Sequence, residues 1–471
     1  MKPTRIPGWV QGLRNTMRVI DCGGKRSATT LSHGHDARAN SMICLRPKAL
    51  SPLLRSASAV QYALRLAMLA LGLASLVVSA KAQTSFKFDF SGRKPAVGWI
   101  PVSPTNDYSA ETGFGFEPGA KMVAEHRKMP SLTSSNPFYF SVKVPEGNYK
   151  ITATLDAGSV ATIKAEQRRL MVQSARTAKG RTATRSFIVN VHTPFISNAE
   201  RVHLKQRELE TETVNWDDKL TLEFNDANPC LAKLVVEKVE LPVVYLAGDS
   251  TVCDQPAEPW NSWGQMLPRF FKADVAVANY AESGESLKTS LGAKRFDKVF
   301  SLMKPGDYLF VQFGHNDQKS KATNALALYK TSLQQIVART RELGGTPVLV
   351  TSMERKGGVE QDTLAGYPAT VRAVAKEANC ALVDLHAMSR TFYRALREDL
   401  GAAFQDGTHH NNYGSYELAK CVVIGIQQAK LPLAKSIVDD FGDFDPAKPD
   451  AVATFAMPPS PKASTRKPLG N

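Results

Sequence analysis

A serine follows a long apolar run in the segment VVYLAGDSTVCDQ, residues 243–255. If that run is a buried strand, Ser250 stands where the strand meets the next helix, and helix amides there favour developing negative charge. Its hydroxyl could then act as a nucleophile. The alternative is structural, because Asp249, Ser250 or Thr251 could simply cap the helix. Two other motifs do not fit: Val252 replaces the second glycine of a Gly-x-Ser-x-Gly elbow, and no Gly-rich run ends in Lys-Ser or Lys-Thr.

A nucleophilic serine needs a base, and the segment DGTHHNNYG supplies two histidines. Asp406 and His409 are three residues apart, so one turn of the chain can bring the carboxylate to the imidazole. The carboxylate would keep one ring nitrogen protonated and leave the other to take the serine proton. His410 is the competing base, but it lies one residue further and points elsewhere. The structural alternative is that Asn411 or Asn412 caps the last helix beside exposed histidines, and adjacent histidines without further ligands do not favour a metal site.

Two further segments could stabilise the oxyanion that such a serine would form. In the sequence GHND, residues 314–317, the side-chain amide of Asn316 could point at an oxyanion over Ser250. The sequence NYAESGESL supplies Gly284, whose backbone N–H is a second candidate donor. Each segment also has a plain structural explanation, because Asn, Asp and Gly commonly close a strand into a turn. The combination therefore indicates hydrolase chemistry more strongly than any one motif.

The elements expected around these segments bring them together. From Val243 the chain alternates between near-continuous apolar runs and helical patterns, which is typical of a doubly wound α/β domain with a parallel sheet. In such a sheet the active site lies at the carboxyl ends of the strands. Ser250 and Asn316 follow the first and third of these runs, and His409 precedes the last helix. The expected strands are 243–248, 275–281, 308–314, 346–352 and 380–385, with helices over 324–344, 368–379 and 413–431.

Residues 84–240 have a different rhythm. Short runs such as FYFSVKV, YKITATL and KLTLEF alternate apolar and polar residues, and turn-rich pieces such as VPEGN and NDANP separate them. Period-two alternation between turns predicts an all-β sandwich. We therefore expect a β-sandwich accessory domain over 84–240 and an α/β catalytic domain over 243–435, with a boundary near Leu241-Pro242.

The net charge of +15 is concentrated at the start of the chain. Residues 1–82 hold 12 Lys and Arg but only 2 Asp and Glu, a net charge of +10, and the 47 basic and 42 acidic residues beyond them leave only +5. Most of the excess positive charge belongs to the leader and not to the expected domains. The charge therefore gives no support to a nucleic-acid partner.

Both ends of the chain are expected to lie outside the two domains. The apolar run 66–80 follows two arginines, and the small-x-small sequence AKA at 80–82 predicts a signal peptide cleaved after Ala82. This predicts a secreted or periplasmic protein. The run is shorter than the roughly 20 residues of a membrane span, so no stable membrane insertion is expected after cleavage, although an uncleaved anchor is the alternative. Residues 445–471, rich in Pro, Lys, Ala and Ser, are expected to form a mobile tail.

Four cysteines follow the leader: Cys230, Cys253, Cys380 and Cys421. In an exported protein they allow one or two disulfides, and sequence alone does not choose among the possible pairings. None has the close CxxC spacing of a zinc site, so we expect no structural metal.

The four polar segments that carry the candidate catalytic residues together resemble the four blocks of the SGNH, or GDSL-like, hydrolases. The matching strings are GDST, AESGES, GHND and DGTHHN. Within that superfamily, AGDSTV, EPWNSWGQMLPRFF and FGHNDQK are similar to strings of the rhamnogalacturonan acetylesterases, carbohydrate esterase family twelve. The resemblance covers about residues 243–430, and residues 84–240 are similar to the β-sandwich that precedes the esterase domain in some bacterial members. The fold that it implies is a flavodoxin-like doubly wound parallel sheet.

The resemblance implies a role for each block. Ser250 would be the nucleophile, His409 the general base and acid, and Asp406 the residue that orients His409. The Ser250 N–H, the Gly284 N–H and the Asn316 side chain would form the oxyanion hole. The family needs no cofactor.

The implied reaction is the removal of acetyl groups from pectic polysaccharide through an acyl-enzyme on Ser250. The same four blocks serve acetyl-xylan, lipid and thioester hydrolases, so the substrate stays open. A non-catalytic carbohydrate-binding protein is the alternative from another class. The expected partner is an acetylated polysaccharide or oligosaccharide.

Several side chains near the predicted site are candidates for contacting the sugar. Trp260 and Trp263 follow the nucleophile in the sequence EPWNSW, and an indole face could stack on a sugar ring, although packing between helix and sheet is the alternative. His410 is a third candidate contact. Three lysines in nearby loops could meet galacturonate carboxylates or form only a solvated face: Lys288, Lys319 and Lys321.

Overall fold

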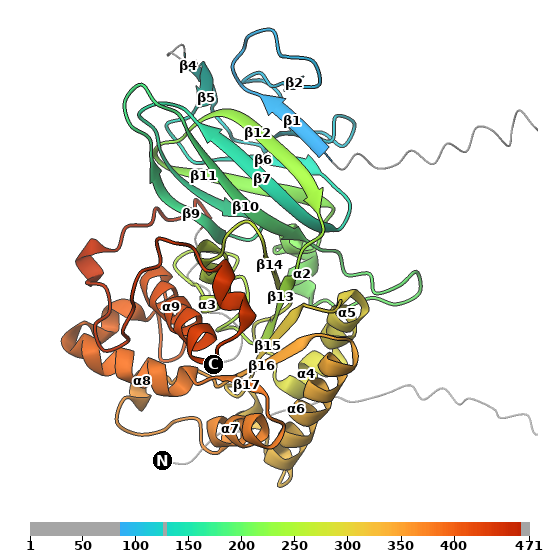
Figure 1. Cartoon of the computed structure of the whole chain (residues 1–471), viewed down its shortest axis with the longest axis vertical. Helices are drawn as coiled ribbons and strands as arrows, with labels where there is room; N and C mark the ends of the chain where they lie inside the picture. Colours follow the sequence, from blue (N-terminus) through green and yellow to red (C-terminus); the bar gives the residue numbers. More distant parts are fainter. Residues whose placement is uncertain (1–84, 126–129, 463–471) are drawn as a thin grey trace, which may run out of the picture. The chain divides into compact units, whose positions relative to one another are not determined.

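The computed structural model describes residues 85–125 and 130–462. Strands before Leu241 form two sheets that are mostly antiparallel, and strands after it form one parallel sheet (Figure 1). The predicted signal peptide lies outside the described residues. Among those residues no helix combines the length and the apolar character needed to cross a membrane.

The region before Leu241 is a β-sandwich, as the period-two alternation predicts. Phe88 and Leu234 of one sheet and Phe140 and Phe224 of the other belong to a single buried cluster, so the sheets pack face to face. One sheet has the order β10 (Ala183–Val191), β7 (Gly147–Leu155), β12 (Cys230–Val239), β1 (Ser85–Asp89) and β2 (Ile100–Pro101), with β5 (Ser131–Thr133) beside β12 and β4 (Val123–Glu125) beside β5. The other has the order β3 (Phe114–Phe116), β6 (Phe138–Lys143), β11 (Lys219–Asn228), β8 (Val160–Ala165) and β9 (Arg169–Arg176).

The parallel sheet has the strand order of a flavodoxin-like fold, which confirms the predicted fold class. Its order is β14 (Ala276–Asn279), β13 (Val243–Gly248), β15 (Tyr308–Gln312), β16 (Thr346–Val350) and β17 (Ala381–Val383). The helices are α2 (Gln206–Glu210), α3 (Trp263–Met266), α4 (Leu287–Gly292), α5 (Arg295–Leu302), α6 (Ala325–Glu342), α7 (Tyr367–Glu377), α8 (Leu385–Leu396) and α9 (Asn412–Gln428). The expected strands and helices of this region are all present. β13 has the expected bounds, α7 and α9 each begin one residue earlier and end sooner than expected, and the others lie within the expected ranges.

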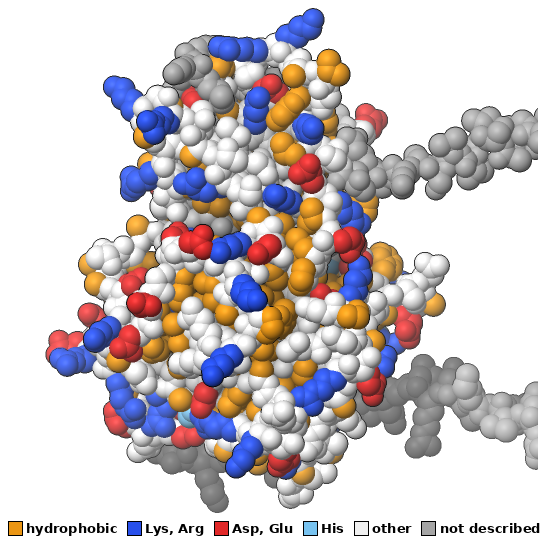
Figure 2. Space-filling model, viewed as in Figure 1, with side chains coloured by type: hydrophobic (Ala, Val, Ile, Leu, Met, Phe, Trp, Pro, Cys, Tyr) orange, Lys and Arg blue, Asp and Glu red, His pale blue; other side chains and the backbone are white. Residues whose placement is uncertain are grey.

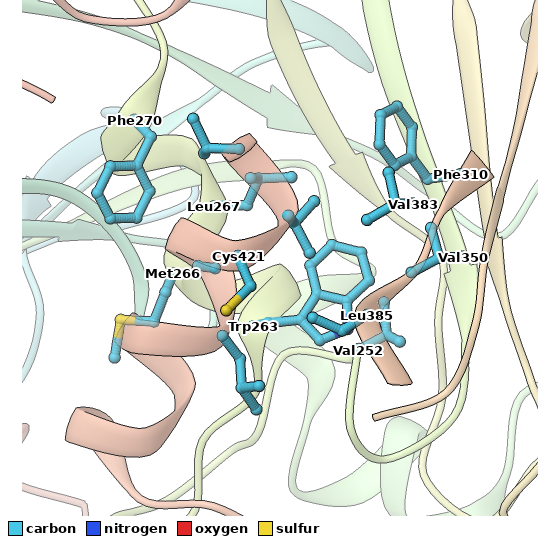
Figure 3. Packing of buried hydrophobic residues seen from close by; sticks show 14 of the residues in the cluster. Val252, Trp263, Met266, Leu267, Phe270, Phe310, Val350, Val383, Leu385 and Cys421 are labelled. Atoms are coloured by element: carbon cyan, nitrogen blue, oxygen red, sulfur yellow. The ribbon is translucent and has the colours of Figure 1, made fainter. Parts of the chain in front are cut away.

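Helices cover the parallel sheet on both faces, so both faces of its strands are apolar. In β13, Val244 and Leu246 join one buried cluster, and Tyr245 and Ala247 join the other. This alternation follows from the period of two along a strand. Helices α3, α8 and α9 line the first cluster and α4 to α7 line the second (Figure 1). Trp263 lies in the first cluster, where Figure 3 shows it among the side chains of the sheet and α9.

The sandwich contributes side chains to both of these clusters. Leu170 of β9 is fully buried in the cluster beneath α3 and α9, and Ile188 of β10 is buried in the cluster on the other face. The sandwich and the α/β region belong to one compact unit of the chain. The sandwich is therefore packed into the α/β region by its own hydrophobic residues.

The structure corrects the expectation of a mobile tail for residues 445–462. The Pro458 carbonyl accepts a hydrogen bond from Lys164 Nζ at 2.9 Å, and Ser460 is almost fully buried. The Ser460 hydroxyl donates to Glu223, and its N–H donates to Glu258. Composition suggested mobility, but buried ion-pairing groups on the sandwich and the α/β region provide the partners that fix this segment.

Cys253, Cys380 and Cys421 are free thiols in the part of the chain that the structure describes. Burial raises the pKa of Cys253 to about 12 and that of Cys380 to about 11, so both stay protonated at neutral pH. None of the pairings that the sequence allows is formed. On the face shown in Figure 2, basic and acidic side chains are interspersed, in keeping with the small net charge beyond the leader.

Candidate active site

Ser250 lies in a tight turn directly after β13. The Asp249 carboxylate closes this turn, because its Oδ1 accepts hydrogen bonds from the Thr251 N–H at 2.9 Å and from the Thr251 hydroxyl at 2.7 Å. The helix expected directly after Ser250 begins only at Trp263, where Ser262 is the N-cap. The helix cap that the sequence offered at Asp249, Ser250 or Thr251 is therefore not formed, and Asp249 closes the turn instead. The Ser250 hydroxyl is left for another partner.

That partner is His409, which links Ser250 to Asp406. Ser250 Oγ lies 2.8 Å from His409 Nε2, and His409 Nδ1 lies 2.9 Å from Asp406 Oδ2. Ser250 is 2% exposed and His409 1% exposed, so both are nearly removed from solvent. Asp406 Oδ1 also accepts the N–H groups of Thr408 and His409, each at 2.7 Å. The spacing of three residues between Asp406 and His409 thus produces the carboxylate–imidazole contact that the sequence predicts.

The charge state of Asp406 sets the hydrogen positions in this chain of contacts. Burial alone raises the pKa of Asp406, but the hydrogen bonds from the His409 ring and from two backbone amides outweigh it and lower the pKa. The carboxylate is therefore ionised and only accepts. His409 Nδ1 must then carry a hydrogen, so Nε2 has its lone pair directed at the Ser250 hydroxyl.

The three predicted oxyanion donors lie beyond adjacent strands of the sheet. β13 lies between β14 and β15, and the parallel register places the ends of these strands at one edge. Gly284 has a φ of +77°, in the left-handed region that glycine adopts without strain. Among the described residues, the N–H groups of Ser250 and Gly284 have no hydrogen-bond acceptor. Two backbone amides are thus available at the same edge as the serine.

Asn316 has a side chain oriented by hydrogen bonds at both ends. Its Nδ2 donates to the Glu285 carbonyl at 3.0 Å, and its Oδ1 accepts from Lys319 Nζ at 3.0 Å. One amide hydrogen remains for a further acceptor. The bond to Glu285 also ties the loop after β15 to the loop that carries Gly284, so the two predicted donors are held together.

Gln255 connects the nucleophile to the oxyanion loop, a role that was not predicted although Gln255 ends the segment VVYLAGDSTVCDQ. Its Nε2 donates to the Ser250 carbonyl at 2.6 Å and lies 3.3 Å from Ser283 Oγ, next to Gly284. Ser283 Oγ also lies 3.1 Å from Cys253 Sγ. A buried polar side chain therefore spans the two loops whose amides face the site.

A second buried pair, His315 and Asp249, supports the turn that carries Ser250. His315 Nδ1 lies 3.3 Å from Asp249 Oδ2, and His315 Nε2 lies 3.0 Å from the Met353 carbonyl. Burial alone raises the pKa of Asp249, but His315 and the two bonds from Thr251 outweigh it and lower the pKa. Asp249 and His315 stand inside the GDST and GHND strings, so their position in the sequence was the signal that they serve the site.

Two of the three predicted sugar contacts are wrong. Trp263 is 1% exposed and donates its indole N–H to Gln312 Oε1 at 2.8 Å, while Gln312 Nε2 donates to Thr251. It is a core residue that braces the nucleophile turn. His410 is 2% exposed, and its Nε2 lies 2.8 Å from the Tyr393 hydroxyl. Burial lowers the pKa of His410 to about 3, so it stays neutral inside the fold.

The third predicted sugar contact, Trp260, lies beside the imidazole of His409. The two ring centroids are 5.9 Å apart and the rings are perpendicular. A contact between Trp260 and a sugar stays a prediction. Asn411, the residue offered as a structural explanation for this segment, does cap α9 by accepting the Gly414 N–H at 3.0 Å. Capping and the placement of His409 are therefore compatible.

One group in the described part of the chain has three potential metal-ligating atoms close together: Glu354, Asp362 and His386. Its ligand atoms are already engaged. Glu354 accepts from the Arg355 and Thr363 amides, and His386 Nε2 lies 3.2 Å from Glu354. The hydrogen bonds fasten the loop after β16, and the group needs no cation to be satisfied.

The chemistry that this arrangement can perform is attack by an activated serine on an ester. Residues 246–415 match the GDSL-like Lipase/Acylhydrolase family. The chain is 35% identical over 221 residues to the rhamnogalacturonan acetylesterase RhgT of Bacillus subtilis (strain 168), covering 42% of this chain and 95% of RhgT. It is 26% identical over 204 residues to a rhamnogalacturonan acetylesterase of Emericella nidulans, covering 37% of this chain and 81% of that protein.

Among solved structures, the chain is similar to YxiM from Bacillus subtilis, with 23% identity and a TM-score of 0.41, covering 74% of this chain and 99% of that one. In sequence, the uncharacterized esterase YxiM is 24% identical over 370 residues, covering 74% of this chain and 91% of YxiM.

Proposed function

Because this chain belongs to the GDSL-like lipase/acylhydrolase family and is a carboxylic ester hydrolase, we propose that it removes O-acetyl groups from plant cell-wall polysaccharide, with acetylated rhamnogalacturonan as its main substrate. The observation that carries the proposal is the hydrogen-bonded chain from Ser250 through His409 to Asp406. The 35% identity to RhgT, over 95% of that enzyme, supports the substrate class.

In the first half of the reaction the acetyl group passes to the enzyme. Ser250 Oγ attacks the ester carbonyl carbon while its proton moves to His409 Nε2, and the Asp406 carboxylate stabilises the imidazolium. The carbonyl oxygen becomes an oxyanion that accepts hydrogen bonds from the Ser250 N–H, the Gly284 N–H and Asn316 Nδ2. The bond between carbonyl carbon and sugar oxygen then breaks. His409 returns the proton to that oxygen, so the sugar leaves as an alcohol and Ser250 carries the acetyl group.

In the second half, water takes the place of the sugar. His409 Nε2 removes a proton from water as its oxygen attacks the acetyl-Ser250 carbonyl, and the same donors hold the second oxyanion. The bond to Ser250 Oγ breaks and His409 protonates that oxygen. Acetate is released and the free enzyme is restored, so no cofactor enters the balance.

The test is acetate release from a panel of substrates by the mature protein. Acetylated rhamnogalacturonan, acetyl-xylan, a long-chain ester and p-nitrophenyl acetate should all be compared by kcat/KM. We expect turnover of p-nitrophenyl acetate and the highest kcat/KM on the pectic substrate. Acetate from none of them would overturn the esterase proposal, and a higher kcat/KM on acetyl-xylan or the long-chain ester would reassign the substrate. Binding to pectin without any acetate release would favour a non-catalytic carbohydrate-binding protein.

We also propose that the protein is exported. The support is the apolar run 66–80 and the AKA sequence at 80–82. Cell fractionation combined with N-terminal sequencing of the mature chain tests this, and the expected first residue is Gln83. An intact leader in the cytoplasmic fraction would contradict it.

A further inference from the structure

The sandwich turn, which we define as residues 166–169, comprises the three residues between β8 and β9 and the first residue of β9. All four side chains are charged or polar, yet each is at least nine-tenths buried. Glu166 and Arg168 have φ values of 53° and 65°, in the left-handed region that non-glycine residues rarely adopt. A strained and buried polar turn persists only when its surroundings fix it.

The sandwich turn is fixed by the segment that follows the nucleophile. Gln167 Nε2 donates to the Asp254 carbonyl at 2.5 Å, and Arg169 Nε donates to the Asp254 carboxylate at 2.5 Å. Arg168 NH1 donates to the carbonyls of Gln255 and Trp260, each at 3.0 Å. Three backbone carbonyls of the segment 254–260 thus accept hydrogen bonds from the sandwich turn.

The same segment contacts the groups that perform the chemistry. Gln255 holds the Ser250 carbonyl, and Trp260 packs against the His409 ring. Arg168 NH2 also lies 2.6 Å from Glu258, whose other oxygen accepts from Asn412 in the first turn of α9. Arg168 therefore contacts Gln255, which contacts the nucleophile, and Trp260, which contacts the base.

We infer that Arg168 is a positioning residue for the proposed reaction, and that the sandwich supports catalysis through this turn. It contacts no reacting atom. Its effect is to hold residues 254–260 so that Ser250 and His409 keep their 2.8 Å contact. Loss of such positioning lowers the rate even when the substrate is small.

The test is Arg168→Met, assayed on p-nitrophenyl acetate, a substrate too small to reach the sandwich. We expect kcat to fall about ten- to one hundred-fold with KM changed less than three-fold. Added guanidinium at millimolar concentration should restore part of the loss, which a merely unfolded fraction would not show. Arg181→Met, at an exposed sandwich position, is the control.

Arg168→Met removes the nearer of two charge partners of Glu258 and leaves Lys164 Nζ at 3.9 Å. The double variant Arg168→Met/Glu258→Gln therefore separates the effect of a weakened charge pair from that of lost positioning. We expect the double variant to be more stable than Arg168→Met but equally slow. Parent-level kcat in a folded Arg168→Met, or full recovery in the double variant, would overturn the inference.

Discussion

The parallel sheet and the sandwich place buried polar residues in opposite ways. In the α/β region they gather beyond the carboxyl ends of three adjacent strands, where Asp249, Ser250 and Asn316 meet the loop of His409. In the sandwich, neighbouring strands run in opposite directions, so their ends are shared between two edges. One group of its buried polar residues instead occupies a single turn, from which Gln167, Arg168 and Arg169 bond to the neighbouring region. The α/β region thus carries the candidate catalytic side chains, and the sandwich holds residues 254–260, which contact them.

The largest effect should come from the strand end that carries the nucleophile. Ser250→Ala should lower kcat on p-nitrophenyl acetate by about 10⁴-fold or more, because no other group can form the acyl-enzyme. The melting temperature should change little, since the hydroxyl contacts only His409 among the described side chains. Retained activity would remove Ser250 from its proposed role and leave the parallel sheet without a distinct function.

A core substitution in the sandwich tests whether the sandwich and the α/β region unfold in a single transition. Phe140 is fully buried at the centre of the aromatic cluster of the sandwich, and Phe140→Ala should cost about 3–5 kcal/mol of unfolding free energy. Because Leu170 and Ile188 of the sandwich lie in the clusters of the α/β region, we expect one urea transition by circular dichroism and by tryptophan fluorescence. Two separate transitions would show that the regions are independent.

A substitution of Asn316, which follows β15, tests whether a second strand end of the parallel sheet supplies an oxyanion donor. Asn316→Ala should lower kcat about 10²- to 10³-fold with a smaller change in KM, because its amide acts on the oxyanion and not on the ground state. Steady-state kinetics on p-nitrophenyl acetate measures this. Asn324→Ala, an exposed asparagine of the following loop, is the control and should match the parent. Equal effects of the two variants would contradict the oxyanion role.

The smallest effect concerns the pH dependence of stability. Burial raises the pKa of Asp317 from its usual 3.8 to about 7, so the folded state binds a proton that the unfolded state has released between these values. Stability contributed by this group therefore falls as pH rises from about 4 to 7. Asp317→Asn should make the unfolding free energy less dependent on pH, by at most about 1.4 kcal/mol per pH unit. Urea unfolding at pH 5, 6 and 7 measures it, and identical slopes would contradict the shift.

Much of the parallel sheet could be predicted because its signals are local. A strand buried on both faces must be apolar, so β13 and β15 stand out in the sequence, and the polar residues after them mark the sheet edge. The pairing of Asp406 with His409 follows from a spacing of three residues. Trp263 and His410 were misjudged because aromatic and imidazole side chains serve cores and sites alike, and their solvent exposure depends on distant partners.

The tail and the sandwich turn show where local signals end. Residues 445–462 have a composition typical of a mobile segment, but Glu223 and Glu258 supply partners from two other parts of the chain. Arg168 looks like an ordinary turn residue, and its importance depends on carbonyls at Gln255 and Trp260. Nothing near these residues in the sequence identifies such partners.

The sequence by itself determined the fold class, the family and the four segments from which the site is built. Periodicity, strand-end polarity and short spacings specify these, because each depends on residues that are neighbours along the chain. The tertiary structure alone decided that Asp249 closes the turn, that Gln255 joins it to the loop of Gly284, and that the sandwich holds residues 254–260. The first two contacts join near neighbours whose geometry the local fold sets, whereas the contacts of the sandwich join residues about ninety positions apart. Only the packing of the sandwich against the α/β region brings those hydrogen-bonding groups within reach.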